Sequence, residues 1–172
     1  MIVKLFLLGL LIILLGSALY AHGNWNPLSQ NTTIDRILIE KAARKMSIFR
    51  DGQKLKTYRI ALGPNPVGHK QQEGDMRTPE GVYTINGRNP DSDYHLSLRI
   101  SYPSDADNAS AAARGVPPGF DIMIHGIANG RGWIGAFHRR KDWTAGCIAV
   151  TDTEMDEIWR ATPDGTTVEI RP

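Results

Sequence analysis

Hydrophobic and polar residues alternate over most of the chain beyond residue 33, which is the pattern of half-buried β-strands. Turn residues divide this pattern into short segments, so we expect about eight strands. The expected strands are 34–40, 45–49, 55–62, 82–85, 96–102, 120–124, 148–150 and 167–170. Asp51-Gly52 lies between the second and third segments and predicts a tight hairpin, whereas Asn86-Gly87 is expected to close the fourth strand.

Two segments have helical patterns instead. Residues 104–114 are rich in alanine and are followed by Gly115. Thr151 and Glu154 have the spacing of a capping box, and Met155 and Ile158 then fall on one helical face. The expected fold class is therefore mostly β, a sandwich or barrel with one or two short helices.

The N-terminal segment has a different composition from the rest of the chain. Lys4 precedes the apolar run 5–15, and small residues follow at 16–18 and at Ala21. This order is typical of an export signal cleaved after Ala18 or Ala21. Without cleavage, residues 2–21 are long enough to anchor the protein in a membrane. A buried N-terminal helix is the less favoured alternative. We therefore expect a protein exported to the periplasm or cell envelope.

Composition excludes several classes of protein. The chain has 172 residues, of which 41% are hydrophobic and 22% charged, so it is neither disordered nor fibrous. Its 20 basic and 18 acidic residues give a net charge of +2 without a basic cluster, which argues against a nucleic-acid partner. A membrane is expected to be contacted only through the N-terminal segment. The single cysteine forms no internal disulfide, and no spacing suggests a structural metal site.

Cys147 is the first candidate for chemistry. It stands between Gly146 and a predicted strand, and a lone cysteine in an exported protein is either buried or retained for its reactivity. A reactive thiol needs a base or a cation nearby. His125 is the preferred base because it ends an apolar strand and precedes Gly126, although it also fits a purely structural role. The basic neighbours of His138 favour a solvated loop there, and His138 is the reserve candidate for the base.

Three motifs give a more specific signal. They are Ile124-His125-Gly126, the loop 74–83 (Gly-Asp-Met-Arg-Thr-Pro-Glu-Gly-Val-Tyr), and the run 142–149 (Asp-Trp-Thr-Ala-Gly-Cys-Ile-Ala). Together they resemble the L,D-transpeptidase catalytic domain (YkuD-type), in the subgroup with an Asp-Trp-Thr-x-Gly-Cys-Ile-Ala motif. The resemblance runs from about residue 34 to 170 and implies that family's β-sandwich or barrel. The expected division is a signal peptide or uncleaved anchor at 1–21, a linker at 22–33 and a catalytic domain at 34–172.

The resemblance also implies residue roles. Cys147 would be the nucleophile, and His125 would act as general base and then as general acid. Thr144 would position the site through its hydroxyl, and the backbone amides around Gly146 and Cys147 would hold the oxyanion. The substrate implied is the peptidoglycan stem peptide, consistent with roles in cell-wall biogenesis and cell shape. No cofactor and no metal are implied.

Three functions remain open from the sequence. The acyl group on the cysteine passes either to an amine, which makes the protein a transpeptidase, or to water. The second case would make it an L,D-amidase or carboxypeptidase that cuts cross-links or releases a wall-attached protein. A non-catalytic wall-binding module is the third.

The candidate substrate-binding residues surround the two catalytic motifs. They are Gly126, Trp133, His138, Arg139 and Trp143, and the segment 131–141 is expected to lie over the cleft. Arg139, Arg140 or Lys141 could meet a stem-peptide carboxylate. Ala145 and Ala149 depart from the family pattern, because a histidine and then an arginine or asparagine are common at those positions.

Overall fold

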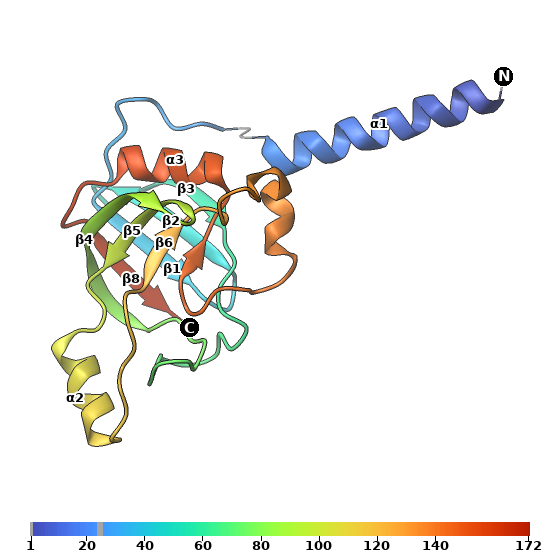
Figure 1. Ribbon diagram of the computed structural model, residues 1–172. Helices are drawn as coiled ribbons and strands as arrows, with labels where there is room; N and C mark the ends of the chain where they lie inside the picture. Colours follow the sequence, from blue (N-terminus) through green and yellow to red (C-terminus); the bar gives the residue numbers. More distant parts are fainter. Residues whose placement is uncertain (1, 24–25) are drawn as a thin grey trace.

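The computed structural model describes residues 2–23 and 26–172. Within them, eight strands form a mixed sheet in the order β3-β2-β1-β8-β4-β5-β6-β7 (Figure 1). The strands are β1 (Arg36–Glu40), β2 (Lys45–Arg50), β3 (Gln53–Arg59), β4 (Gly81–Ser92), β5 (His95–Ile100), β6 (Met123–His125), β7 (Ile148–Ala149) and β8 (Thr167–Arg171). The expectation of a mostly β fold with a few helices is confirmed.

The sheet curls so that its two ends meet. Ala61, just after β3 at one end of the sheet, bonds in both directions to Ala149 of β7 at the other end, with both N···O distances 2.9 Å. The long strand β4 connects the two halves, pairing first with β8 and then with β5. Within the β4–β5 pairing, the register shifts between Ile85 and Gly87. Asn86-Gly87 is therefore a bulge inside β4, and the prediction that it ends the strand is wrong.

Local turn and cap chemistry follows the sequence closely. Asp51 and Gly52 have φ angles of 50° and 77°, the left-handed conformations that a two-residue hairpin between β2 and β3 requires. Ser104 caps α2 (Asp105–Ala113), and Thr151 caps α3 (Asp152–Ala161) in a complete capping box with Glu154. A 3₁₀ segment, η1 (Gly132–Arg140), occupies the predicted insertion.

One hydrophobic core lies inside the curled sheet. Ile37, Ile39, Leu98, Ile124 and Ile148 are each completely buried in it. Each such side chain contributes about 1.5–3 kcal/mol to the free energy of folding by leaving water. The two shortest strands, β6 and β7, are thus fixed from behind by the core, which makes their ends a rigid support for side chains on the opposite face.

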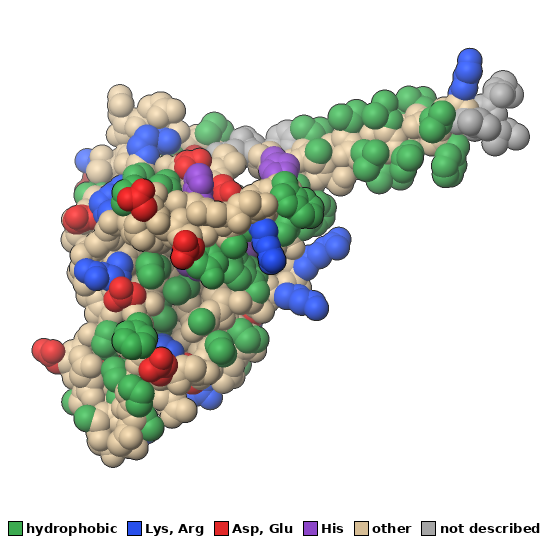
Figure 2. Space-filling view, in the orientation of Figure 1, with side chains coloured by type: hydrophobic (Ala, Val, Ile, Leu, Met, Phe, Trp, Pro, Cys, Tyr) green, Lys and Arg blue, Asp and Glu red, His purple; other side chains and the backbone are tan. Residues whose placement is uncertain are grey.

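Helix α1 (Ile2–His22) projects away from the sheet with its apolar side chains exposed (Figures 1 and 2). It is long and apolar enough to cross a membrane, a property that signal sequences share. Its last turn packs on η1: Ala21 is buried, and the Trp133 carbonyl oxygen lies 3.0 Å from Nε2 of His22. Positions 24 and 25 of the predicted linker lie outside the described residues.

Candidate active site

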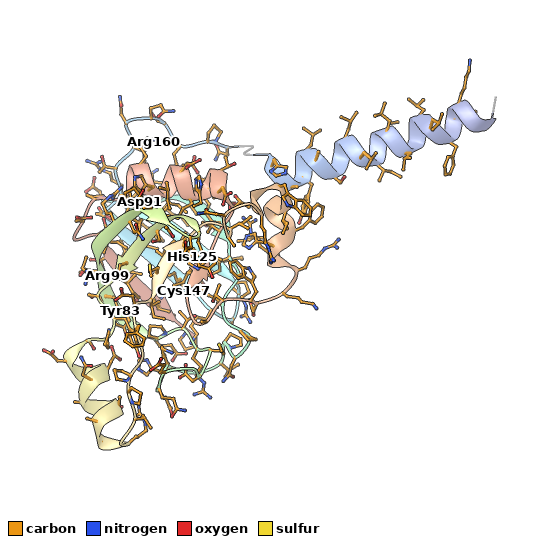
Figure 3. All side chains as sticks on the ribbon, viewed as in Figure 1. Tyr83, Asp91, Arg99, His125, Cys147 and Arg160 are labelled. Carbon is orange, nitrogen blue, oxygen red and sulfur yellow. The ribbon has the colours of Figure 1, made fainter. Side chains whose placement is uncertain are left out.

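The register of β6 with its neighbours places His125 between β5 and β7. In the parallel β6–β7 pair His125 lies opposite Ala149, and in the antiparallel β5–β6 pair it lies opposite Ser97. Cys147 immediately precedes β7, and although 22 positions separate it from His125, both residues line the same pocket; Figure 3 labels the two positions.

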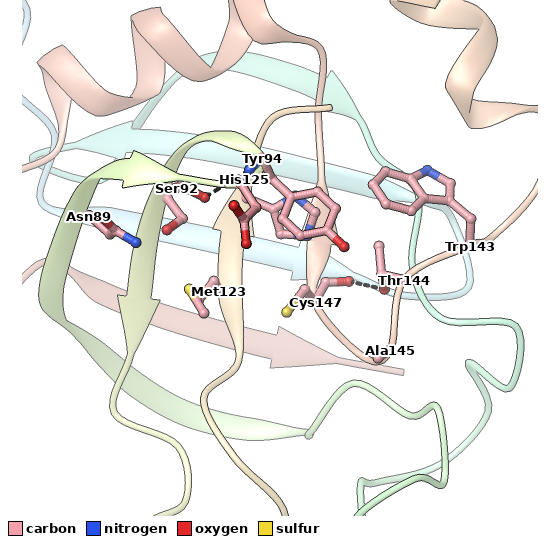
Figure 4. A pocket seen from close by; sticks show the side chains of 11 residues that line it. Asn89, Ser92, Tyr94, Met123, His125, Trp143, Thr144, Ala145 and Cys147 are labelled. Atoms are coloured by element: carbon pink, nitrogen blue, oxygen red, sulfur yellow. Dashed lines mark hydrogen bonds between the residues drawn. The ribbon is translucent and has the colours of Figure 1, made fainter. Parts of the chain in front are cut away.

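Both side chains line a pocket of about 400 Å³ (Figure 4). One wall comes from the β4–β5 corner and β5: Asn89, Ser92, Asp93, Tyr94 and Ser97. The rest comes from β6 and the segment before β7: Met123, His125, Trp143, Thr144, Ala145 and Cys147. The pocket therefore gathers residues from three separate stretches of the chain around the Cys147 sulfur and the His125 imidazole ring.

His125 is held in one orientation and one tautomer. Its ring is 4% exposed, and Nδ1 lies 2.7 Å from the backbone oxygen of Gly126. Because a carbonyl oxygen only accepts, Nδ1 must carry the proton and Nε2 the lone pair. The ring centroids of Tyr94 and Trp143 lie 4.7 Å and 5.7 Å from that of His125. Burial lowers the pKa of His125, against the opposing effect of the Gly126 carbonyl, so the ring is neutral.

Cys147 is partly exposed as a residue, but its sulfur is set into the wall of the pocket. Burial raises the pKa of the thiol, while the backbone N–H of Met123 and the charge of Lys70 act in the opposite direction. With the pKa of Cys147 raised and that of His125 lowered, the resting pair is a thiol and a neutral imidazole. A nucleophilic role for Cys147 would therefore require a base for the thiol proton, and Nε2 of His125 in the same pocket is the candidate.

The loop before Cys147 is fixed by hydroxyl groups. The Thr144 hydroxyl donates to the Cys147 backbone oxygen at 2.7 Å and accepts from the Gly146 N–H at 3.2 Å. From the other side, the Thr78 hydroxyl donates to the Gly146 oxygen at 2.8 Å. Gly146 has φ +124°, and an added Cβ would meet the Arg77 carbonyl oxygen at 2.5 Å. The glycine is thus required both by its backbone conformation and by the close approach of the neighbouring loop.

Asp142 anchors the start of the same segment. Its carboxylate accepts from the Leu62 backbone N–H at 2.9 Å and forms an ion pair with Arg44 at 2.7 Å. The Leu62 oxygen in turn accepts from the N–H groups of Trp143 and Thr144 at 2.8 Å and 3.0 Å. These bonds fix the direction in which the segment enters the pocket.

The loop 74–83 supports the site from behind. The Asp75 carboxylate accepts from backbone N–H groups of Gln71 and Arg77 and from the Lys70 ammonium at 2.7–3.0 Å. Although burial opposes it, these donors lower the pKa of Asp75. Lys41, completely buried at the end of β1, donates at 2.9 Å to the Thr78 backbone oxygen. The loop is therefore folded around two charged side chains, and it delivers Thr78 to the Cys147 loop.

The segment after His125 needs glycine for packing reasons. A Cβ on Gly126 would lie 2.7 Å from Oδ1 of Asp152 and 2.9 Å from Cβ of His95. The same Asp152 carboxylate accepts from the Ile127 N–H at 2.8 Å. Gly126 therefore serves the site by close backbone approach and by its carbonyl oxygen on His125.

The other predicted binding residues lie in different places. Trp143 separates the Cys147 pocket from a second pocket of about 480 Å³ and lines both. His138 lines the second pocket only; its Nδ1 accepts from Nε1 of Trp143 at 3.3 Å, and burial lowers its pKa to about 3. The solvated loop considered for His138 is wrong, since the residue is 9% exposed. Trp133 is 75% exposed and lines neither pocket, and Arg139 is paired with Glu154.

The two alanines that depart from the family pattern differ in environment. Ala149 is completely buried and paired with Ala61, so its side chain cannot reach a ligand in the pocket. Ala145 is exposed and lines the pocket. A larger residue at 145 would narrow the pocket entrance, whereas one at 149 would disturb the closure of the sheet.

Sequence reasoning assigned no role to several residues that build the site. Lys41, Thr78, Asp152 and the β4–β5 corner are the main examples. The motif 74–83 did contain Thr78, but nothing in its spacing showed that its hydroxyl meets Gly146. The β4–β5 corner had only a signal of polar residues, which is typical of any surface turn.

A cysteine just before β7 and a neutral histidine at the end of β6 thus line one pocket on a curled mixed sheet. A family model described as the L,D-transpeptidase catalytic domain (YkuD) matches residues 34–170. The chain belongs to this family, as the resemblance indicated.

Similar proteins and solved structures also point to this family and its fold. YafK of Escherichia coli (strain K12) is 31% identical over 110 residues, which are 63% of this chain and 37% of YafK. The crystal structure of the helical cell shape determining protein Pgp2 from Campylobacter jejuni matches 82% of this chain and 48% of Pgp2, with TM-score 0.62 and 23% identity. Bdellovibrio bacteriovorus Bd1075 matches 84% of this chain and 50% of its own, with TM-score 0.56 and 24% identity. This chain thus spans half the length of these relatives or less, and the structural matches establish the fold.

Proposed function

We propose that the protein is an exported cysteine acyl-transferase that remodels peptidoglycan stem peptides by L,D-transpeptidation. The observation that carries the proposal is the shared pocket: Cys147 and His125 both line it, and the contact of Nδ1 with Gly126 leaves the lone pair of His125 on Nε2. Membership of the L,D-transpeptidase family supports the substrate class.

In the first step, the Cys147 sulfur attacks the carbonyl carbon of the third residue of the stem peptide, and Nε2 of His125 takes the thiol proton. The amide C–N bond then breaks. The proton on Nε2 passes to the leaving amine of the terminal D-amino acid, and a thioester remains on Cys147. The Cys147 thiol and the His125 imidazole are both neutral at rest, which fits this concerted proton transfer, because no thiolate–imidazolium ion pair has to be neutralised first.

In the second step, an amine from another stem attacks the thioester and gives up a proton to His125. The new amide leaves, and the Cys147 thiol takes the proton back. Exchanging one amide for another requires no external source of energy. With water as the nucleophile the same steps give a carboxylate, so the protein would be an amidase or carboxypeptidase that opens cross-links or releases a wall-attached protein.

The amides that would hold the oxyanion are not equivalent. The N–H of Gly146 already donates to the Thr144 hydroxyl. We therefore assign the oxyanion contact to the N–H of Cys147, and give Gly146 and Thr144 the role of holding that N–H in place. One such donor typically contributes about 2.7–4 kcal/mol to the transition state.

The N-terminal helix supports an address outside the cytoplasm. Residues 4–22 have a mean hydropathy of 2.2 and are almost fully exposed, as expected for a signal sequence or an anchor. The packing of Ala21 on Gly135 favours retention, because cleavage after Ala21 would cut at that contact. We propose an envelope protein whose catalytic domain lies on the far side of the membrane.

Incubation of the purified full chain with disaccharide-tetrapeptide tests the proposal. Mass spectrometry should show loss of the terminal D-amino acid together with dimeric or amine-exchanged products. Cys147→Ala and His125→Gln should abolish turnover while keeping the wild-type circular dichroism spectrum. A hydrolysed product alone would favour the amidase, and full activity of Cys147→Ala would end both proposals.

A further inference from the structure

The Cys147 pocket has a distinct electrostatic character. Among the described residues that line it, Asp93 is the only one with a formal charge, because His125 is neutral. The chain as a whole carries a net charge of +2, so this negative pocket is a local feature. A ligand group that enters the pocket will therefore be favoured if it is cationic and disfavoured if it is anionic.

The corner that carries Asp93 is rigidly held. Asn129 donates from Nδ2 to the Ser92 oxygen at 3.0 Å and accepts at Oδ1 from the His95 N–H at 2.9 Å. The N–H of Asn129 also donates to the Asp93 oxygen at 2.8 Å, and the Tyr94 N–H donates to the Ser92 hydroxyl at 3.1 Å. These bonds all use the backbone of Asp93 or its neighbours. Within the described residues its carboxylate has no hydrogen bond and no ion pair, so it is available to a ligand.

A second polar group in the pocket also lacks a partner. Ser97 is 1% exposed, and its hydroxyl oxygen makes no hydrogen bond to any described residue. It stands opposite His125 in the β5–β6 pairing and lines the same pocket as Asp93. Buried hydroxyl groups are normally satisfied, so an unpaired one in a pocket wall indicates a ligand that supplies a donor or acceptor.

We propose that Asp93 and Ser97 form a subsite for a primary ammonium group of the substrate. An ammonium carries three donors and no acceptor, which matches a carboxylate and a hydroxyl oxygen. The proposal rests on the proposed function and narrows its substrate class: the subsite takes either the free side-chain amine of a diamino acid in the donor stem or the incoming acceptor amine. Anionic ends of the stem must then point elsewhere.

The first test compares two donors that differ at one amine. One is a disaccharide-tetrapeptide with a free amine on the side chain of its third residue; in the other that amine is acetylated, which removes the charge. Wild-type protein should prefer the free amine in kcat/KM by about 10- to 100-fold, the range expected for one charge-assisted hydrogen bond. Asp93→Asn should lose this preference, and Ser97→Ala should weaken it.

Asp91→Asn is the matched control. Asp91, labelled in Figure 3, lies near the end of β4, two residues before Asp93, which is in the turn that follows. Both acids are exposed, but Asp91 does not line the pocket. This variant should behave as wild type with both donors. If the ammonium belongs to the acceptor instead, Asp93→Asn should leave donor hydrolysis unchanged and raise KM for the acceptor amine by a similar factor.

Binding measured in the Cys147→Ala background separates this proposal from the proposed function. Calorimetry with the two donors should show the same charge preference in Kd without any turnover. Two results together would overturn the ammonium subsite. The two donors would have equal Kd values, and Asp93→Asn would have the same KM for the acceptor amine as Asp91→Asn. Absence of turnover in wild type with the preference retained in Kd would overturn only the proposed reaction.

Discussion

Replacing Thr144 by valine keeps the shape of a buried side chain and removes one hydroxyl. That hydroxyl bonds to the Cys147 carbonyl and to the Gly146 N–H, and Thr144 is 5% exposed. Each lost hydrogen bond costs about 1 kcal/mol, and the buried groups left unpaired add to this, so we expect a total loss of about 2–4 kcal/mol in the free energy of unfolding. For a domain of this length the midpoint of thermal unfolding should fall by roughly 4–16 °C.

The assay combines stability with reactivity. Urea unfolding gives the free energy, and kcat/KM with disaccharide-tetrapeptide reports whether the Cys147 N–H still meets the oxyanion. Thr144→Val should lower kcat/KM by more than about tenfold, since one misplaced oxyanion donor costs several kcal/mol. Thr144→Ser keeps both hydrogen bonds and is the control: it should lose only the contribution of one methyl group, about 1 kcal/mol.

Two outcomes would exclude this role of the Thr144 hydroxyl. If Thr144→Val unfolds within about 0.5 kcal/mol of wild type, the two hydrogen bonds do not hold the loop. If it is destabilised as expected but retains wild-type kcat/KM, the loop is held for stability alone and Thr144 does not position the reacting groups.

Three further predictions follow from the same contacts. Because burial raises the pKa of Cys147, the ultraviolet absorbance of its thiolate should appear only above the ordinary cysteine pKa of about 8.5, and a thiolate at neutral pH would contradict this. Because burial lowers the pKa of His125, kcat/KM should fall on the acid side only below the ordinary histidine pKa of about 6.5. Gly126→Ala should lower both the unfolding midpoint and kcat/KM, because the new Cβ meets Asp152 at 2.7 Å; an unchanged variant would show that the close packing is not needed. The pKa of Asp75 is lower in the folded protein than the ordinary carboxyl pKa of about 3.9, so the ionised carboxylate stabilises the fold above that pH, and this stability is lost as pH falls through the folded-state pKa. The free energy of unfolding, measured against pH, should therefore fall less steeply at acid pH in Asp75→Asn than in wild type. Equal slopes would show that the Asp75 carboxylate does not contribute this stability.

Local signals in the sequence predicted local structure well. The hairpin at Asp51-Gly52 and the capping box at Thr151 depend on backbone preferences of a few neighbouring residues, and both formed as expected. Asn86-Gly87 carries the same kind of turn signal but became a bulge, because β4 continues from β8 onto β5. Pairing partners distant in the chain decided that outcome, and no local pattern reports them.

In the candidate site, too, some features follow from neighbouring residues and others from contacts between distant parts of the chain. The motifs around His125 and Cys147 pointed to the proposed reacting groups, and the structure places both residues in the wall of one pocket. Lys41 could not be found in this way, because a single lysine after a strand is ordinarily exposed. It is buried here because three acceptors, from Gly68, Thr78 and Glu80, surround its ammonium in the folded chain. Groups whose role depends on several distant partners are visible only in three dimensions.

In the proposed reaction the Cys147 thiol, with His125 as its base, becomes acylated by a stem peptide. Mass spectrometry of the intact protein after brief mixing with disaccharide-tetrapeptide detects this acylation. We expect a covalent adduct on Cys147 equal to the stem peptide less its terminal D-amino acid, absent in Cys147→Ala and formed much more slowly in His125→Gln. Turnover of the substrate without any adduct, and at the same rate in Cys147→Ala, would show that Cys147 is not the nucleophile.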